Sequence, residues 1–152
     1  MIYYFAYGSN TNKEDLEKWC KKTKQKVILR NLVKYLLRGY NLEFRGHSEA
    51  RRGGVATIHK MVGGEVWGVI YQTDEKSLDS LDIKEGEKYK RIGLKIFLNK
   101  KEETVIVYIM KKNKINRPNK EYIKIIIEGL RKHEISQKYL RILKNIETNE
   151  IN

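Results

Sequence analysis

Residues 2–10 read IYYFAYGSN, and the character of this stretch changes abruptly near its end. Its first six residues are β-branched or aromatic, apart from one alanine, which favours a strand. Gly8 tolerates backbone angles that a side chain forbids, and Ser9 and Asn10 favour turns because their side chains hydrogen-bond the nearby backbone. The next residues, TNKE at 11–14, fit a capping box at the start of a helix. We therefore expect a strand, a tight turn and the beginning of a helix.

A turn of this kind gathers free N–H groups at the end of a strand. Such a group of donors suits an anion or a polarised carbonyl oxygen. An ordinary strand-to-helix connection has the same sequence pattern. The spacing by itself therefore leaves a binding turn and a structural turn as alternatives.

Helix and strand patterns follow along the whole chain. A helix is expected at 12–22, with Leu16, Trp19 and Cys20 on its buried face, and extended structure at 32–44. The other expected elements are a polar loop at 45–52, strands at 53–58 and 65–71, a helix at 73–81, a loop at 84–89, strands at 89–98 and 104–110, a helix after Asn119 with Ile123, Ile126, Ile127 and Leu130 as its stripe, and a helix after Ser136 with Tyr139, Ile142, Leu143 and Ile146 as its stripe.

Glycines divide the middle of the chain. Gly63 and Gly64 lie between two strand patterns, which predicts a hairpin. Gly68 lies inside the second strand pattern and predicts a bulge or a close backbone approach.

Strands occupy the middle and helices the ends, without βαβ alternation. We therefore expect an α+β fold, a small mixed, largely antiparallel β-barrel flanked by helices.

Length and composition predict a single domain over residues 1–152. Apolar residues make up 40% of the chain and charged residues 34%, as in globular proteins. The one cysteine, Cys20, allows no intrachain disulfide and favours a reducing, cytoplasmic setting. The apolar run at the start is too short for a signal peptide, and no stretch approaches the roughly 20 apolar residues that cross a membrane. The sequence predicts no particular oligomeric state.

The formal net charge of +13 suggests an acidic partner such as RNA or DNA. Lysine is spread along the chain, and its densest run, KWCKKTKQK at 18–26, has no repeated basic-aromatic module beside it. Biased composition gives the same charge without selection for binding. Nucleic-acid binding is therefore the alternative function rather than the first one.

Few residues of this chain are arranged for catalysis. The three histidines are isolated in sequence, which predicts no metal site, and no cofactor-binding fingerprint is present. Carboxylates cluster at Asp79, Asp82, Glu85 and Glu87. Glu85 directly precedes Gly86, after a helix that Leu78 and Leu81 would anchor to the core. Its side chain is therefore a candidate to point inwards, with ordinary surface exposure as the alternative.

Four segments in order carry a resemblance to a known family. They are YFAYGSN at 4–10, GGVATI at 53–58, VWGVIY at 66–71 followed by LD at 81–82 and EG at 85–86 with Tyr89, and PNKEY at 118–122 before EGL at 128–130. Together they span nearly the whole chain. In this respect the sequence resembles the gamma-glutamyl cyclotransferases.

The resemblance implies a small β-barrel with surrounding helices and a reaction that needs no cofactor. The substrate is a small γ-glutamyl compound whose α-amine attacks its own γ-carbonyl to form 5-oxoproline. Glu85 matches the general acid/base of the family. The turn at Tyr7, Gly8, Ser9 and Asn10 matches the substrate cradle, whose N–H groups receive the developing oxyanion. Tyr89 and Tyr122 match substrate-contacting positions, with a buried aromatic core as the alternative.

Some positions depart from the family pattern. Thr11 stands where relatives usually carry an apolar residue, and Asn119 stands where a serine is common. The segment RGHSEARR at 45–52 is unusually basic, so Arg45, Arg51 or Arg52 is a candidate to bind a substrate carboxylate, with solvent exposure as the alternative. The sequence does not select among possible leaving amines.

Overall fold

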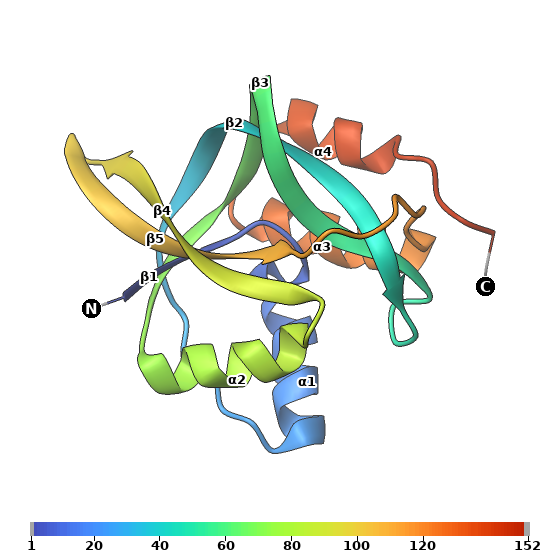
Figure 1. The fold of residues 1–152 in the computed structure, drawn as a ribbon, viewed down its shortest axis with the longest axis horizontal. Helices are drawn as coiled ribbons and strands as arrows, with labels where there is room; N and C mark the ends of the chain where they lie inside the picture. Colours follow the sequence, from blue (N-terminus) through green and yellow to red (C-terminus); the bar gives the residue numbers. More distant parts are fainter. Residues whose placement is uncertain (1, 151–152) are drawn as a thin grey trace.

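The computed structural model describes residues 2–150, and Figure 1 shows their arrangement. The elements, in chain order, are β1 (Ile2–Ala6), a 3₁₀ turn η1 (Ser9–Thr11), α1 (Lys13–Thr23), β2 (Arg30–Ser48), β3 (Gly53–Thr73), α2 (Glu75–Glu85), β4 (Tyr89–Leu98), β5 (Lys101–Met110), α3 (Lys120–Lys132) and α4 (Gln137–Lys144). The predicted α+β class is confirmed.

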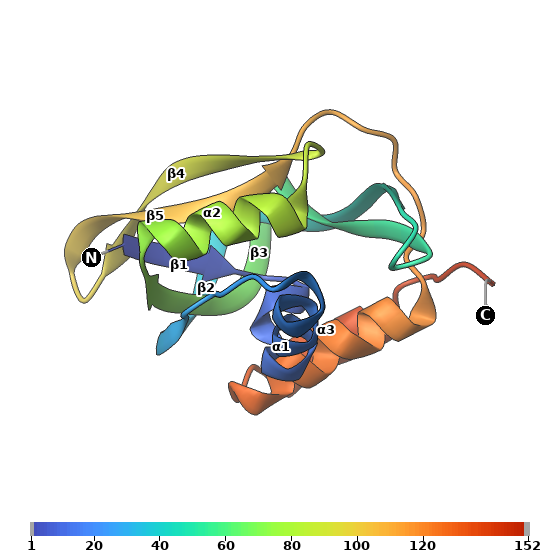
Figure 2. The ribbon, with the colours of Figure 1, turned by 90° about the horizontal axis from the view of Figure 1, so that it is seen from below.

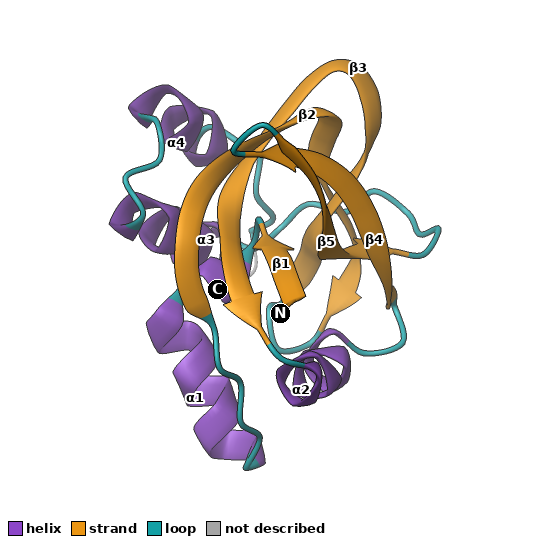
Figure 3. Ribbon diagram, turned by 90° about the vertical axis from the view of Figure 1, so that its left-hand side faces the viewer, coloured by secondary structure: helices purple, strands orange, loops and turns teal. Residues whose placement is uncertain are grey.

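The described strands form one five-stranded sheet in the order β2-β3-β1-β5-β4. β1 lies at its centre, antiparallel to β3 and parallel to β5, and the other neighbouring pairs are antiparallel. The sheet is strongly curved, as Figure 3 shows. Within residues 2–150 the edge strands β2 and β4 do not pair with each other, so the sheet is barrel-like without being closed.

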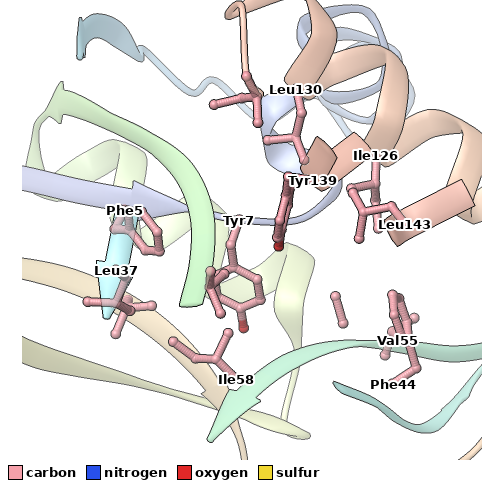
Figure 4. Close-up of a cluster of buried hydrophobic side chains, with 14 of the residues drawn as sticks. Phe5, Tyr7, Leu37, Phe44, Val55, Ile58, Ile126, Leu130, Tyr139 and Leu143 are labelled. Carbon is pink, nitrogen blue, oxygen red and sulfur yellow. The ribbon is translucent and has the colours of Figure 1, made fainter. Parts of the chain in front are cut away.

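Helices lie on both faces of the central strand because its side chains alternate between two hydrophobic clusters. Phe5 and Tyr7 belong to a cluster with apolar residues of α3 and α4, part of which is shown in Figure 4. Tyr4 and Ala6 belong to a second cluster with apolar residues of α1 and α2. Figure 2 shows α2 running across the sheet and the start of α1 beside α3. The end of β1 is therefore enclosed by helices from both halves of the chain.

The hairpin predicted around Gly63 and Gly64 is wrong. β3 continues through both glycines and pairs with β2 on either side of them. The pairing passes from Arg38↔Glu65 to Tyr40↔Lys60, so residues 61–64 bulge from β3 opposite Gly39. β2 extends as far as Ser48, into the predicted polar loop at 45–52. The turn of the hairpin between β2 and β3 therefore lies at 49–52.

Gly68 confirms the predicted close backbone approach. A Cβ atom at this position would lie 2.4 Å from the carbonyl oxygen of Ala6 and 2.7 Å from the ring of Phe5. Neither neighbour can move freely, because both belong to the central strand. Glycine at this position therefore lets β3 lie close against β1.

Two further expectations, on the cap of α1 and on the buried face of α4, need correction. The expected capping box at 11–14 is not formed. Instead, Asn12 caps α1, accepting a hydrogen bond from the Asp15 amide at 3.0 Å. In α4, Ile142 is 55% exposed, whereas Leu140 takes its place in the core. The α2 and α3 caps, Asp74 and Asn119, are confirmed.

Candidate active site

The turn after β1 is fixed by its own backbone. The Thr11 hydroxyl donates to the Gly8 carbonyl oxygen at 2.7 Å, and the Thr11 amide donates to the same oxygen at 3.1 Å. The amides of Ser9 and Asn10 precede the first hydrogen bond of η1, so they remain available to a bound group. Thr11, the departure from the family pattern, is buried and serves this turn.

Helix α3 holds the turn from behind. The Asn12 side-chain amide donates to the Ile125 carbonyl oxygen at 2.9 Å. A Cβ at Gly129 would lie 2.6 Å from the Thr11 hydroxyl oxygen and 2.7 Å from the Asn12 amide nitrogen. The EGL segment of the sequence thus has a physical role, because only a glycine allows this close contact between α3 and the turn.

The sequence predicted a loop at Glu85, but the structure shows that Glu85 is the last residue of α2. Gly86 ends the helix with a φ of 76°, a conformation that glycine adopts readily. Asp82, one turn earlier, accepts from the Tyr108 hydroxyl at 2.5 Å and pairs with Arg91 at 3.0 Å. These contacts attach the end of α2 to β5 and β4, and so fix where Glu85 begins.

Asn10 connects the turn to Glu85. Its side-chain nitrogen donates to Glu85 Oε1 at 3.1 Å and to the Tyr4 hydroxyl at 2.8 Å. Its side-chain oxygen accepts from Lys84 Nζ at 2.8 Å. The turn and the carboxylate are 75 residues apart in sequence, and a single side chain spans the gap between them.

Tyrosines form the wall opposite this contact. The Tyr89 hydroxyl donates to the Ala56 carbonyl oxygen at 2.5 Å, and the Ala56 amide donates to the Tyr122 hydroxyl at 3.0 Å. The Tyr7 hydroxyl donates to the Tyr108 carbonyl oxygen at 2.5 Å. The aromatic rings are therefore held rigidly by the backbone of β3 and β5.

Two hollows meet at Glu85. A small cavity of about 30 Å³ is lined by the β1 end, the turn, Glu85 and the tyrosine wall. An outer cleft of about 750 Å³ runs between α1, the 49–52 turn and the end of α2. Ser9, Glu85, Tyr89 and Tyr122 line both hollows. All seven site residues predicted from the sequence, Tyr7, Gly8, Ser9, Asn10, Glu85, Tyr89 and Tyr122, line the small cavity.

Burial raises the pKa of Glu85, because it penalises the charged carboxylate. The nearby Lys84 charge, the hydrogen bond from Asn10 and the Arg51 charge oppose this rise without cancelling it. Burial also raises the pKa of Tyr7, Tyr89 and Tyr122, with the Glu85 charge adding to the effect. These hydroxyls therefore stay protonated near neutral pH, and Glu85 is the carboxyl group that lines the small cavity.

The candidate arginines do not form a free anion site. Arg51 lines the outer cleft, but its guanidinium makes a two-point contact with Asp15 at 2.9 and 2.6 Å and lies over the Tyr122 ring. Arg45 is paired with Glu43 at 2.7 Å and lines neither hollow. Arg52 also lines neither of them. Only Arg51 therefore belongs to the site, with its charge already paired.

Sequence reasoning missed Tyr4 and Lys84. Tyr4 belongs to the face of β1 opposite Tyr7, yet its hydroxyl reaches Asn10 and lines the small cavity. Lys84 gave no signal beyond its place next to Glu85. Among residues 2–150 no three His, Cys, Asp or Glu side chains are grouped to hold a metal ion, and no helix is long and apolar enough to cross a bilayer.

Comparison with known proteins identifies relatives along nearly the full length. The sequence model of the AIG2-like family matches residues 65–143, more than half of the chain. Proteins named gamma-glutamylcyclotransferase from Mus musculus and Homo sapiens are each 34% identical to it, with 97% of this chain and 79% of each relative covered.

Solved structures agree with the sequence matches. A structure titled "Gamma-glutamyl cyclotransferase" superposes with a TM-score of 0.87 at 30% identity, covering 99% of this chain and 90% of that one. Similarity of this extent covers both the turn after β1 and the end of α2. We conclude that the chain belongs to the gamma-glutamyl cyclotransferase family, within the AIG2-like proteins.

Proposed function

We propose that this protein is an enzyme that releases 5-oxoproline from a small γ-glutamyl amine or amino acid. The relatives named gamma-glutamylcyclotransferase support this activity, and the site offers the chemistry that it needs. The reaction is intramolecular: the substrate's α-nitrogen attacks its own γ-carbonyl carbon, and the amine on that carbon departs. Holding the chain folded for ring closure accounts for a large part of such a rate gain.

Glu85 is the proton carrier in this proposal. An α-ammonium has no free electron pair, so its proton must pass to a base before the nitrogen attacks. The raised pKa of Glu85 makes the carboxylate a stronger base than an ordinary glutamate. Glu85 passes this proton to the departing amine nitrogen as its bond to the γ-carbon breaks, and a second proton from the ring nitrogen follows the same route, which leaves a neutral lactam and an ammonium product. Glu85 ends the cycle in its starting state.

The turn after β1 is the oxyanion cradle in this proposal. Attack turns the γ-carbonyl oxygen into an alkoxide, which needs hydrogen-bond donors at once. Ser9 and Asn10 line the small cavity beside Glu85, and their amides have no partner within η1. The cavity suits the compact reacting group, and the outer cleft leaves room for the departing amine.

A single observation carries the proposal: the 3.1 Å contact from Asn10 Nδ2 to Glu85 Oε1. It joins the proton carrier to the donor-rich turn inside one cavity. A protein that used this fold only for binding has no need of that convergence. The nucleic-acid alternative is not favoured, because neither the contact nor the family membership supports it. Cys20, the one cysteine, supports a reducing, cytoplasmic setting.

A panel of γ-glutamyl substrates tests the proposal. The purified protein should release 5-oxoproline from at least one γ-glutamyl amino acid or γ-glutamyl amine, as measured by chromatography. Glu85→Gln keeps the shape of the side chain but removes the base, so it should lower kcat by about 10²–10⁴-fold. Glu128→Gln, exposed on α3 and outside both hollows, is the control and should keep full activity. Full activity of Glu85→Gln would remove Glu85 from the mechanism.

A further inference from the structure

We propose that Lys84 is a positioning residue of this site, whose ammonium group fixes the side-chain amide of Asn10 and, through it, the Glu85 carboxylate. The assignment to catalysis rests on the proposed function, whereas the physical arrangement of the three side chains does not. Lys84 lines the outer cleft and contacts no part of the tyrosine wall through a hydrogen bond among the described residues. Its role therefore runs through Asn10.

The direction of each hydrogen bond follows from chemistry. An ammonium group only donates, so the Asn10 atom that faces Lys84 Nζ at 2.8 Å must be the amide oxygen. The amide nitrogen is then directed to the other side, where its two hydrogens meet Tyr4 Oη at 2.8 Å and Glu85 Oε1 at 3.1 Å. A flipped amide would place NH₂ against NH₃⁺, which costs two hydrogen bonds at once.

This orientation decides what Glu85 can do. Because Asn10 presents a donor, Glu85 Oε1 must accept, and the proton of the acid form is confined to Oε2. A carboxyl group held in this way exchanges its proton from one known oxygen, which suits a carrier that must both take and return it. Without Lys84 the amide is free to rotate, and this restriction is lost.

Lys84 also acts on Glu85 through charge. Burial lowers the pKa of Lys84, and the neighbouring Glu85 charge opposes that change. The Lys84 charge is in turn the largest of the influences that lower the pKa of Glu85, followed by the Asn10 hydrogen bond and the Arg51 charge. Removing Lys84 therefore raises the pKa of Glu85 further. Arg51 is held by Asp15 and cannot replace it.

Other ionisable groups also face Glu85, from every element around it. Arg51 approaches from the β2–β3 turn, with Asp15 of α1 behind it. Four tyrosines have pKa values that the Glu85 charge raises, namely Tyr4, Tyr7, Tyr89 and Tyr122. All four stay protonated across neutral pH, so they do not mask the effect of Lys84.

The test compares Lys84→Met with Lys88→Met. Methionine keeps the length and bulk of the lysine stem but has no ammonium group, and Lys88 is an exposed lysine that lines the same cleft. The first readout is the titration of the Glu85 carboxyl carbon by ¹³C NMR, without substrate. Lys84→Met should shift this titration to higher pH, and Lys88→Met should leave it in place.

The second readout is the pH profile of kcat/KM. Lys84→Met should lower kcat/KM at neutral pH by about 10- to 100-fold. It should also move the acidic limb of the profile to higher pH. Lys84→Arg, which restores a charged donor, should recover most of both effects. A lysine that only supports the fold would show neither the shifted limb nor the rescue.

Either readout can overturn the proposal. A Lys84→Met protein whose Glu85 titration and kcat/KM match those of wild type contradicts it. If Lys84→Met does not fold, the ¹⁵Nζ titration of wild-type Lys84 decides instead. A Lys84 that titrates in the same pH range as the exposed lysines would contradict the buried contact with Asn10. A wild-type protein that is inactive on every γ-glutamyl compound refutes the proposed function, and the NMR titrations still decide the role of Lys84.

Discussion

Glu85 is kept in surroundings that disfavour its charged form, which has a consequence for stability. Its pKa is raised in the folded protein, so the folded state binds the proton more tightly than the unfolded chain does. Its contribution to stability is therefore fully present below the unfolded pKa of about 4.3 and is lost as the pH rises through the folded value. At neutral pH the ionised group destabilises the fold.

Glu85→Gln should therefore stabilise the protein at pH 7. The neutral amide avoids the cost of burying a charge and can still accept from Asn10. The melting temperature should rise by about 2–4 °C for each kcal/mol gained, and the gain should shrink as the pH falls towards 4. Calorimetry at several pH values measures this. Glu87→Gln should show no such gain, and a Glu85→Gln protein that melts lower at pH 7 would contradict the raised pKa.

A substitution at Gly8 should affect substrate binding more than folding. A Cβ added there would lie 3.5 Å from the Ala56 Cβ and 3.9 Å from the Tyr122 hydroxyl, which are ordinary contacts. Its φ of −122° is negative, so the position needs no left-handed backbone angle. All three residues line the small cavity. A methyl group at position 8 should therefore fit the fold but occupy space that the substrate needs.

We expect Gly8→Ala to melt within a few degrees of wild type and to lose about tenfold or more in kcat/KM for the γ-glutamyl substrate. Steady-state kinetics beside a thermal melt measures the two effects separately. Unchanged kinetics in a well-folded variant would show that the reacting group does not enter the small cavity.

At the scale of elements, the packing of α3 against η1 determines where the turn lies. Alanine is a better helix former than glycine by about 1 kcal/mol, so Gly129→Ala would ordinarily stabilise α3. Here the new methyl group would meet Thr11 and Asn12 at 2.6–2.8 Å. Since part of that contact is backbone, the helix or the turn must shift.

Gly129→Ala should therefore destabilise the protein by about 1–3 kcal/mol and lower kcat, because the displaced turn carries the proposed oxyanion donors. Denaturant unfolding and kinetics give the two values. Glu128→Ala, exposed on the same helix, is the matched control and should be nearly neutral. A Gly129→Ala protein more stable than wild type would mean that the turn yields at little cost.

Local patterns predicted most elements of this chain but not how two of the strands pair. Alternation and caps located β1, α1, β4, β5 and α3 to within a few residues. The hairpin at Gly63 and Gly64 failed because two glycines favour a bulge as readily as a turn, and only pairing with β2 decides between them. The candidate site residues came from motif likeness, whereas Lys84 and Tyr4 contact Asn10 through hydrogen bonds that no sequence pattern encodes.

At the scale of the whole molecule, the central position of β1 explains how the site is assembled. β1 pairs with β3 on one side and β5 on the other, so its end reaches the middle of the curved sheet. There the amino-terminal turn meets Glu85 from α2, Tyr89 from β4 and Tyr122 from α3. Residues from most of the chain length thus converge on one cavity.

The same molecule carries a net charge of +13, which should oppose its folding. Half of the described ion pairs are exposed contacts such as Lys13–Glu17 and Lys95–Glu102, and pairs of this kind contribute little. Repulsion among the remaining lysines acts over roughly 10 Å at about 0.1 M salt and over longer distances in more dilute salt, so it is screened as the salt concentration rises. We therefore expect the melting temperature to increase by a few degrees between about 0.02 and 0.3 M NaCl. A double variant, Lys112→Glu with Lys124→Glu, replaces two exposed positive charges by negative ones and should melt higher than wild type in low salt, with a smaller response to NaCl. A melting temperature that falls with added salt would mean that attractive ion pairs outweigh the repulsion.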